Sequence, residues 1–471
     1  MNVLRMGAVS LLFPFSAALA IPPEIDVIPA APHFDRLTQQ KNSNHSAGKV
    51  IAVNNAQLAK QPELGKVFLN QAVRDGDWLI VEAILPVYET TTNADNTLIR
   101  FAKAGLARSK GNYELAITHY RAILSEHPEL DAVRLDMAVT MYENHQYDIS
   151  EYHFRRVLQG SPPENIREII AYYIERVQQG HDVTGSLSFS YLNESNVNNA
   201  SSGKTIRVGD RLFLRNKDSF PQRGEGLWFN GVLQKDVPIY NQHSLRFMGA
   251  VNGKSYWSNH NFDDVTSRIY AGYQWRNYRH QFSLLPFYEK RWYSTETFSS
   301  GPGLRTEYSY LISPAWQISQ AFEYQKLNYD ADKYHFLRGR TSYSSTTLSH
   351  AFSNVLSAYV GVDFQDQQTT SKSETNHRSA VRGGVQMDLS WKLSFAASTA
   401  FAKREYQANS EIFGTRRKDN EQFYNLSLWQ RDLSVFGMMP KLNFTYKRVN
   451  SNIDFYAYDQ RNITLSVDKI F

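Results

Sequence analysis

The sequence predicts an α+β multidomain protein, in which N-terminal α-helical tetratricopeptide (TPR) repeats precede a 14-stranded antiparallel transmembrane β-barrel. Three observations carry this prediction. A helical segment repeats with a period of 34 residues, and near residue 183 the apolar spacing changes from helical to strict alternation. Beyond that point, short connections alternate with long polar ones, which is typical of outer-membrane barrels.

The composition limits the classes of protein that fit. The 471 residues include no cysteine, which excludes disulfide frameworks, thiolate nucleophiles, zinc–thiolate and iron–sulfur sites. A mean hydropathy of -0.48 excludes a polytopic helical membrane protein but not a barrel, because alternating strands average to near neutral. Aromatic residues reach 13%, and seven of the 8 tryptophans lie beyond residue 183, so this excess belongs mostly to the predicted barrel.

Residues 1–20 have the order of a secretory signal peptide. Arg5 precedes an apolar run that ends in Ala18-Leu19-Ala20, a small-x-small cleavage pattern. An N-terminal anchor helix is the alternative, although the run is short for a membrane span. We therefore expect export, followed by a flexible lead-in over residues 21–60, which are rich in Pro, Ala and Asn.

Residues 61–182 are predicted to form a TPR-like helical domain in the periplasm. Six positions recur 34 residues later: Gly111, Tyr113, Ala116, Tyr120, Leu124 and Pro128 return as His145, Tyr147, Ser150, Phe154, Leu158 and Pro162. This spacing is the TPR period. Ala116 and Ser150 are small residues, and we expect two helices to cross at those positions.

Stacked TPR hairpins line a concave groove with their first helices. The family pattern places six residues on that side, and we interpret them as a protein- or peptide-binding groove: Phe101, Arg108, Leu135, Tyr142, Tyr173 and Arg176. The alternative is that these residues only pack between repeats, and packing is the favoured interpretation for Leu135.

Residues 183–471 are predicted to form the outer-membrane β-barrel. Runs such as 356–364, 381–389 and 393–401 alternate apolar residues with others, which indicates strands whose faces meet different solvents. The expected strands lie near 185–192, 226–236, 243–254, 266–276, 281–291, 304–312, 315–325, 336–352, 355–366, 379–389, 393–404, 421–432, 441–450 and 461–471. A soluble β-sandwich is the alternative, but it does not require alternating connection lengths.

The connections orient the predicted barrel in a Gram-negative outer membrane. Long polar loops such as 193–225 and 405–420 are expected outside, and short turns in the periplasm. An even strand number leaves both ends of the barrel on the periplasmic side, which agrees with a helical domain upstream. The chain ends on Phe471 after an alternating strand, a signal for the barrel assembly machinery, although Lys469 departs from the pattern.

The aromatic residues of the barrel are expected at the two membrane interfaces, where their rings lie in hydrocarbon and their polar edges among head groups. The positions that fit such girdles are Tyr273, Trp275, Trp292, Tyr293 and Trp316.

The sequence contains no motif for catalysis or cofactor binding. GxSxG, P-loop, GxGxxG, HExxH and EF-hand patterns are absent, and His350, His377 and Ser379 form no recognisable hydrolase constellation. The acidic pairs Asp263-Asp264 and Asp330-Asp332 are interpreted as solvated loop charge, with calcium binding as the alternative. We therefore expect no catalytic residue, no metal ligand and no cofactor, and the export signal disfavours nucleic-acid binding.

Three segments of the predicted barrel resemble a known protein family. They are Ser188–Ala200 (SFSYLNESNVNNA), Asn252–Trp257 (NGKSYW) followed by Asn261–Asp264 (NFDD), and Leu285–Tyr293 (LPFYEKRWY). Together with the two-part layout, they resemble the surface lipoprotein assembly modulator (Slam) family. The barrel segments are specific, whereas the repeats alone are not.

This resemblance implies an outer-membrane translocon that moves client proteins from periplasm to cell surface. Clients in the family are surface lipoproteins that capture transferrin, lactoferrin or haem, and in some members soluble haem-binding proteins. The expected partners are such a client, a periplasmic chaperone, the barrel assembly machinery and outer-membrane lipids. A client would pass unfolded, or partly through an opened seam between 185–192 and 461–471. A polysaccharide-export porin with TPR repeats and a passive surface-binding barrel remain as alternatives.

Overall fold

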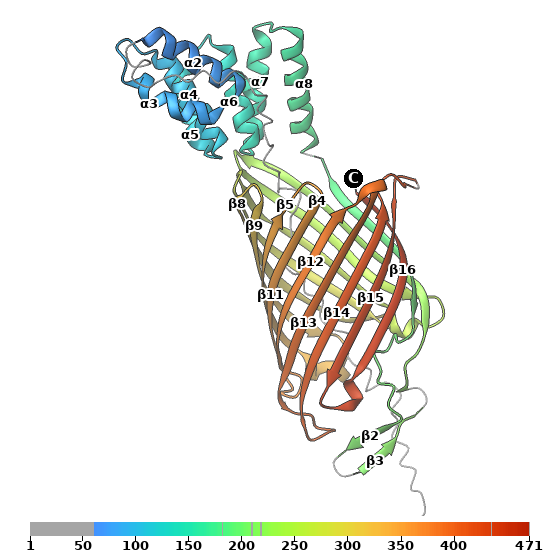
Figure 1. Ribbon diagram of the computed structural model, residues 1–471. Helices are drawn as coiled ribbons and strands as arrows, with labels where there is room; N and C mark the ends of the chain where they lie inside the picture. Colours follow the sequence, from blue (N-terminus) through green and yellow to red (C-terminus); the bar gives the residue numbers. More distant parts are fainter. Residues whose placement is uncertain (1–60, 181, 209–210, 217–218, 435, 471) are drawn as a thin grey trace, which may run out of the picture.

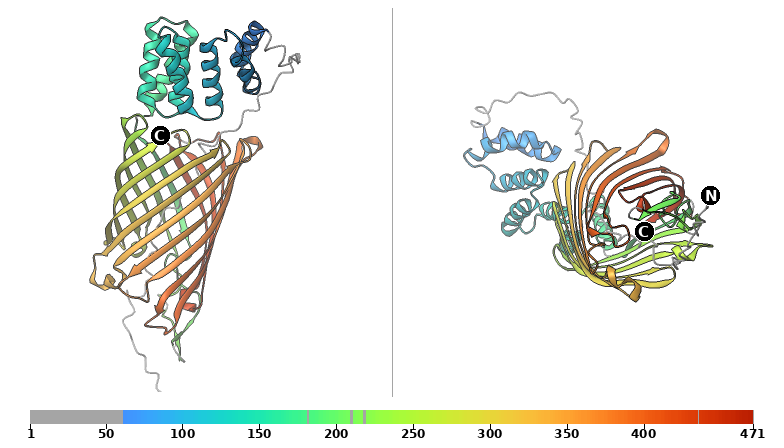
Figure 2. Two further views of the ribbon diagram at one scale, coloured as in Figure 1. Left: turned by 90° about the vertical axis from the view of Figure 1, so that its left-hand side faces the viewer. Right: turned by 90° about the horizontal axis from the view of Figure 1, so that it is seen from below.

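In a computed structural model of the chain, residues 61–180, 182–208, 211–216, 219–434 and 436–470 are described. The predicted signal peptide, lead-in and terminal Phe471 lie outside these residues. A stack of helices stands at one end of a closed barrel (Figures 1 and 2). We call the barrel end beside the helices the proximal end, and the opposite end the distal end.

The described part of the N-terminal region is helical throughout. Its helices are α2 (Pro62–Asp75), α3 (Trp78–Glu89), α4 (Asn96–Ser109), α5 (Tyr113–Glu126), α6 (Asp131–Glu143), α7 (Tyr147–Gln159) and α8 (Glu164–Gln179). Asp77, Asp95 and Asn112 lie directly before three of these helices and cap them, because their side chains accept hydrogen bonds from free backbone N–H groups of the first turn. In the described residues, no helix is both long and apolar enough to cross a membrane.

The repeat positions lie where helices pack against one another. Ala116, Ser150 and Phe154 are fully buried, which agrees with the expectation that small residues allow helices to cross. The hydroxyl of Ser150 donates a 2.7 Å hydrogen bond to the carbonyl oxygen of Ala138, so its polar group is satisfied inside the core.

The barrel closes with fourteen antiparallel strands, in the order β1-β16-β15-β14-β13-β12-β11-β10-β9-β8-β7-β6-β5-β4. The fold class predicted from the sequence is thus confirmed. The barrel strands are β1 (Thr184–Glu194), β4 (Gly224–Tyr240), β5 (His243–Tyr256), β6 (Asp264–Arg276), β7 (His280–Tyr293), β8 (Glu296–Ser313), β9 (Trp316–Tyr329), β10 (Gly339–Ala351), β11 (Leu356–Thr369), β12 (Asn376–Asp388), β13 (Leu393–Asn409), β14 (Arg416–Gln430), β15 (Met439–Ser451) and β16 (Tyr458–Ile470).

The barrel wall is polar inside and apolar outside. On β9, the inward side chains of Glu323 and Gln325 are each 2% exposed, whereas the outward side chains of Phe322 and Tyr324 are 45% and 40% exposed. The same alternation runs through β10 and β11. Exposed apolar side chains in regular alternation are what a strand surrounded by lipid requires.

One feature of the distal end differs from the sequence-based expectation. The stretch 193–225, expected as a loop, contains the hairpin β2 (Thr205–Val208) and β3 (Arg211–Leu214), which extends beyond the barrel (Figure 1). Ile206 and Val208 of this hairpin pack against a small core of Phe413, Ile453 and Phe455. The hairpin forms because residues far apart in the chain provide that core.

Two further positions also differ. The strand expected from residue 336 begins at Gly339, because residues Asp332–Leu337 form a short 3-10 helix. Tyr293 was expected at a membrane interface, but it packs against Phe298, Tyr329 and Leu337 at the distal end. This interior contact overrides the interfacial preference of its side chain.

Candidate functional site

The predicted groove residues lie on α4, α6 and α8, the first helices of successive hairpins and the closing helix. Arg108 lies in the last turn of α4, and its guanidinium makes two 2.7 Å hydrogen bonds to the Glu143 carboxylate on α6. Burial opposes the charge of Arg108, but the hydrogen bonds and charge of Glu143 outweigh it and raise the pKa of Arg108. Paired N–H···O bonds of this kind fix orientation as well as charge.

A half-buried carboxylate lies close to this ion pair. Burial raises the pKa of Asp136 on α6, while Arg108 counteracts the shift and Glu143 adds to it. The guanidinium of Arg108 therefore interacts electrostatically with two carboxylates, those of Glu143 and Asp136.

Aromatic side chains continue the same surface toward α8. The rings of Tyr142 and Tyr173 meet edge to face with centroids 5.0 Å apart, and Tyr173 stacks on Phe154 at 5.2 Å. Burial raises the pKa of Tyr173, with Glu143 contributing further. The exposed Arg176 lies over the ring of Tyr172 at 5.3 Å. Arg108, Glu143, Tyr142, Tyr173 and Arg176 thus form one continuous surface, which we call the groove strip.

The other two predicted groove residues contribute mainly to packing. Phe101 lies against the core around Ile117 and Tyr120, with its ring 5.8 Å from that of Tyr120. Leu135 packs against the core that contains Phe154. Both are partly buried, so they support the groove strip from beneath.

The helices contact the barrel through equivalent positions of two repeats. Lys110 and Asn144 are 34 residues apart, and each lies in the turn between the two helices of a hairpin. The carbonyl oxygen of Lys110 accepts a 2.8 Å hydrogen bond from Arg279, and that of Asn144 accepts a 2.9 Å bond from Gln242. Arg279 and Gln242 lie in the proximal turns that follow β6 and β4. Since Asn144 directly follows Glu143, the groove strip reaches the barrel rim.

Aromatic contact strengthens this junction. The rings of Tyr113 and Tyr278 lie 4.5 Å apart, and the backbone N–H of Tyr278 donates to the side-chain oxygen of Asn144 at 3.3 Å. Burial raises the pKa of the Tyr113 hydroxyl. The helical region is therefore held to the proximal turns by hydrogen bonds and ring packing.

Removing the junction side chains in the variant Gln242→Ala/Arg279→Ala is expected to loosen the helices from the barrel. Two hydrogen bonds of about 1 kcal/mol each correspond to a roughly thirtyfold change in the ratio of docked to undocked helices. Limited proteolysis of residues 180–183 in the full chain measures this change. The variant Lys392→Ala/Gln430→Ala is the control, because it removes side chains at the proximal rim that do not contact the helices, one in the turn before β13 and one at the end of β14. Equal cleavage rates in the two variants would contradict the junction.

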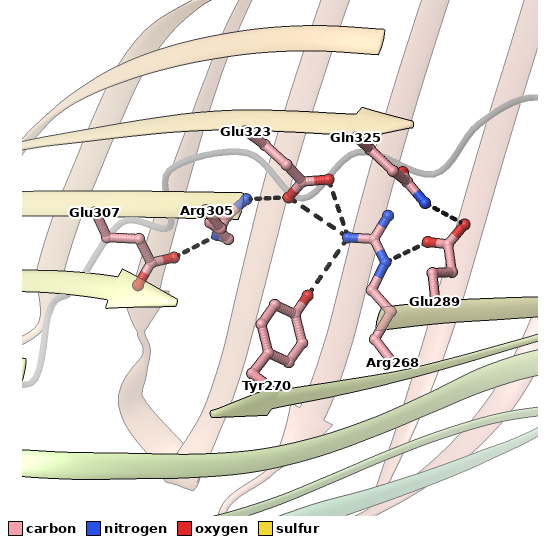
Figure 3. A network of polar contacts seen from close by, with 7 residues as sticks. All are labelled: Arg268, Tyr270, Glu289, Arg305, Glu307, Glu323 and Gln325. Atoms are coloured by element: carbon pink, nitrogen blue, oxygen red, sulfur yellow. Dashed lines mark hydrogen bonds and ion pairs between the residues drawn. The ribbon is translucent and has the colours of Figure 1, made fainter. Parts of the chain in front are cut away.

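Inside the barrel, a network of buried charges joins four neighbouring strands (Figure 3). Arg268 on β6 binds Glu289 on β7, and it also binds Glu323 on β9 at 3.2 Å. Arg305 on β8 binds the other oxygen of Glu323 at 3.0 Å.

The network extends to neutral and acidic neighbours. Tyr270 accepts from Arg268, Glu307 accepts from Arg305, and Gln325 donates to Glu289. Removing one partner of a buried ion pair costs about 3–5 kcal/mol, because the other charge stays buried and uncompensated. Buried ion pairs therefore connect strands β6 to β9 on the inside of the barrel wall. The turn between β6 and β7 contains Arg279, which contacts the helices.

The closure between the first and last strands is the shortest ladder of the described barrel. β1 pairs with β4 over all residues from Thr184 to Glu194, but with β16 only from Ser186 to Ser190. Beyond Ser190 no ladder pairs join the two described strands toward the distal end. Side chains bridge this part: Gln460 donates to the carbonyl oxygen of Asn196 at 3.3 Å, and Asn462 donates to Glu194 at 3.4 Å. We call this closure the seam.

The acidic pairs singled out from the sequence are in part engaged by the protein itself. Asp263 accepts hydrogen bonds from the backbone N–H of Tyr256 and the hydroxyl of Ser255, and Asp264 pairs with Arg291. Asp332 lies beside His335 at 3.0 Å. Within the described parts of the chain, no cluster of three or more His, Asp or Glu side chains is arranged to hold a metal ion.

Sequence reasoning missed Glu143, the junction and the inward charges. Glu143 follows Arg108 by 35 residues, one more than the repeat period, which places the two side chains in neighbouring repeats. Arg268, Glu289, Arg305 and Glu323 are charged residues inside predicted strands, and such residues avoid lipid and must face the interior. Both signals were present in the sequence, although the partners depend on strand register.

Family comparisons cover both parts of the chain. The family model "surface lipoprotein assembly modifier" matches residues 184–471, and the model for that family's N-terminal TPR repeats matches residues 51–154. The resemblance drawn from the sequence is confirmed by these matches.

Individual relatives align over nearly the full length. The surface lipoprotein assembly modifier of Pasteurella multocida is 27% identical over 449 residues, which are 91% of this chain and 87% of the relative. Surface lipoprotein assembly modifier 2 of Haemophilus influenzae strain Rd is 28% identical over 430 residues, covering 90% and 88%. The hemophilin secretion modulator of Acinetobacter baumannii is 25% identical over 422 residues, covering 85% and 84%.

Proposed function

The chain belongs to the surface lipoprotein assembly modifier family, and from this premise we propose that it is an outer-membrane translocon for specific client proteins. The clients are surface lipoproteins or secreted haem-binding proteins, as the names of its relatives indicate. The observation that carries the proposal is the joining of a groove-bearing helical stack to the rim of a fourteen-strand barrel, with family matches to both parts. Neither a polysaccharide-export porin nor a passive surface-binding barrel is favoured by these matches.

The proposed orientation places the helical region, residues 61–182, in the periplasm and the barrel, residues 183–471, in the outer membrane. Most connections at the proximal end are short turns, and most at the distal end are longer, including the one that contains the β2–β3 hairpin (Figure 1). The exceptions are the short distal turn between β7 and β8 and the longer proximal connection between β14 and β15. In outer-membrane barrels the short turns are periplasmic and the long loops extracellular. This asymmetry supports the orientation.

The groove strip is proposed to receive the client or the chaperone that delivers it. Arg108, Tyr142, Tyr173 and Arg176 offer cationic and aromatic contacts on one surface, while Phe101 and Leu135 support that surface from the core. Aromatic faces and paired charges suit an extended polypeptide, whose backbone and side chains are both available. Because the strip ends at the junction, a bound segment is delivered to the proximal rim.

The client is proposed to cross in an unfolded form and to leave through the seam. A barrel of fourteen strands is only moderately wider than an eight-strand barrel filled by its own side chains, so a folded domain does not fit. Buried ion pairs hold the β6–β9 wall, whereas the seam has a short ladder and side-chain bridges. Opening is thus least costly between β1 and β16, where a lipid anchor could remain in the membrane.

No catalytic step or cofactor enters the proposal. The sequence contains no P-loop, and folding of the client outside the cell is the proposed driving force. The barrel assembly machinery and outer-membrane lipids remain proposed partners of the chain itself. Co-expression with a candidate lipoprotein, followed by antibody staining of intact cells, tests the proposal: client on the surface only when this chain is present supports it.

A further inference from the structure

We propose that the lipid-facing surface of β9–β13, toward the distal end, binds lipopolysaccharide through the phosphates and acyl chains of its lipid A part. The inference rests on the orientation given under the proposed function, because lipopolysaccharide occupies the outer leaflet. It concerns a surface that the translocation pathway does not use. The strands β11, β12 and β13 face the viewer in Figure 1.

A hollow lies on the outside of the barrel wall. Outward side chains in direct register form a row across five strands, namely Phe322, Ser344, Phe364, Ser379 and Lys403. Serines alternate with phenylalanines, so each small side chain leaves a gap between large neighbours. The resulting hollow has a volume of about 530 Å³.

A second, more apolar hollow continues this surface toward the proximal end. It has a volume of about 470 Å³, and its lining includes Leu348, Val360, Val362, Val381 and Phe401. A second row on the same face consists of Thr346, Val362, Val381 and Phe401. Each of these residues is two positions along its strand from a member of the first row. Together the hollows provide an apolar depression that begins near the distal ends of the strands, as acyl chains require.

Cations lie on the distal side of the first hollow. Lys326 and Arg340 are directly opposite each other on β9 and β10, an arrangement of like charges that is unfavourable without an anion between them. Arg340 also donates to the side-chain oxygen of Gln368 at 2.6 and 3.0 Å. A phosphate placed between these two exposed side chains would remove their repulsion.

Acidic neighbours do not cancel this positive charge. On this surface Glu405 pairs with Lys403 at 3.0 Å and lies 3.9 Å from Arg416, and Asp366 pairs with His377 at 2.8 Å. The outward basic residues at the distal ends of β9, β10, β13 and β14 are Lys326, Arg340, Lys403, Arg416 and Lys418, whereas Arg404 and Arg417 pair with the inward carboxylates of Glu421 and Asp419. These five exceed the two carboxylates by three charges, with histidine neutral.

The spread of the cations favours a ligand with several phosphates. From β9 to β14 there are five interstrand spacings, which together measure about 24 Å. A phospholipid with one phosphate reaches only part of this width, whereas the phosphates of lipid A and of its neighbours in the leaflet reach more. Lipid A also has about six acyl chains per molecule, which suit two adjoining hollows better than the two chains of a phospholipid do.

Native mass spectrometry of the full chain in detergent, with purified lipid A added, tests the assignment. The variant Lys326→Gln/Arg340→Gln/Lys403→Gln is expected to retain at least tenfold less lipid A than the unaltered chain. The matched control is Lys290→Gln/Arg448→Gln/Arg461→Gln, which removes three outward basic residues on β7, β15 and β16. The control is expected to retain lipid A normally.

A second variant tests the hollow rather than the charges. Ser344→Phe fills the gap between Phe322 and Phe364, and it is expected to reduce lipid A retention about tenfold with every cation in place. Barrel folding in each variant is checked by its heat-dependent shift on gels. Equal retention in the triple variant and its control, or equal binding of phosphatidylglycerol, would overturn the proposal. No client is present in this measurement, so a negative result leaves translocation unaffected.

Discussion

Locking the seam with a disulfide is expected to stop client display, and reduction is expected to restore it. Ser190 and Ser466 are directly opposite each other in the short β1–β16 ladder, and both side chains are buried. Because the chain has no cysteine, the variant Ser190→Cys/Ser466→Cys introduces its only two thiols. If the client leaves between these strands, surface staining of intact cells falls at least tenfold when the bond is oxidised.

A second ladder provides the control for this experiment. Ser309 on β8 and Ser319 on β9 are also directly opposite and buried, with their hydroxyl oxygens 3.0 Å apart. The variant Ser309→Cys/Ser319→Cys places a bond inside the wall that the buried charges already hold, and display is expected to stay normal. Normal display from a fully oxidised seam variant would show that the client does not need the seam to open.

Exchanging the charges of the groove strip is expected to abolish client display without unfolding the helices. Arg108→Glu alone places a third carboxylate beside Glu143 and Asp136, and both stability and display are expected to fall. The exchange Arg108→Glu/Glu143→Arg re-forms an ion pair and restores stability. It leaves the opposite charge at each position, so display is expected to remain at least tenfold reduced.

Thermal unfolding, followed by the circular dichroism signal of the helices, measures stability, and surface staining measures client display. Together they separate the role of Arg108 in stability from its role in contacting the client. The control is Arg155→Glu/Glu151→Arg on α7, an exposed pair 2.6 Å apart that lies outside the groove strip. This control is expected to keep both stability and display. Recovery of display in the Arg108 exchange would mean that the pair acts only through packing, and that the client does not contact the cation.

Much of the architecture follows from periodicity. A period of two over long stretches indicates a sheet whose faces meet different solvents, and the even number of strands follows from counting alternating connections. The 34-residue repeat placed Ala116 and Ser150 correctly at buried helix crossings. These features depend on local spacing, which a single sequence contains in full.

Other features depend on contacts between distant segments. The β2–β3 hairpin is held by Phe413 and Phe455, about two hundred residues away, and Tyr293 turns toward a core built with Phe298 and Leu337. The partners of Arg268 are fixed by the relative register of β6, β7 and β9, where a slip of one residue would turn each side chain to the lipid. Alternation along a strand separates its two faces, but it does not show which inward residues meet.

The most direct test of translocation is surface display of a client in a laboratory Gram-negative host that has no relative of this chain. A lipoprotein or haem-binding protein from a neighbouring gene is co-expressed with the chain, and intact cells are stained for the client. Total client is measured in lysed cells, so that loss of expression is distinguished from loss of export. The proposed function predicts strong staining with the chain and only background staining without it. Equal staining in the presence and absence of the chain, for each of several neighbouring candidates, would contradict it.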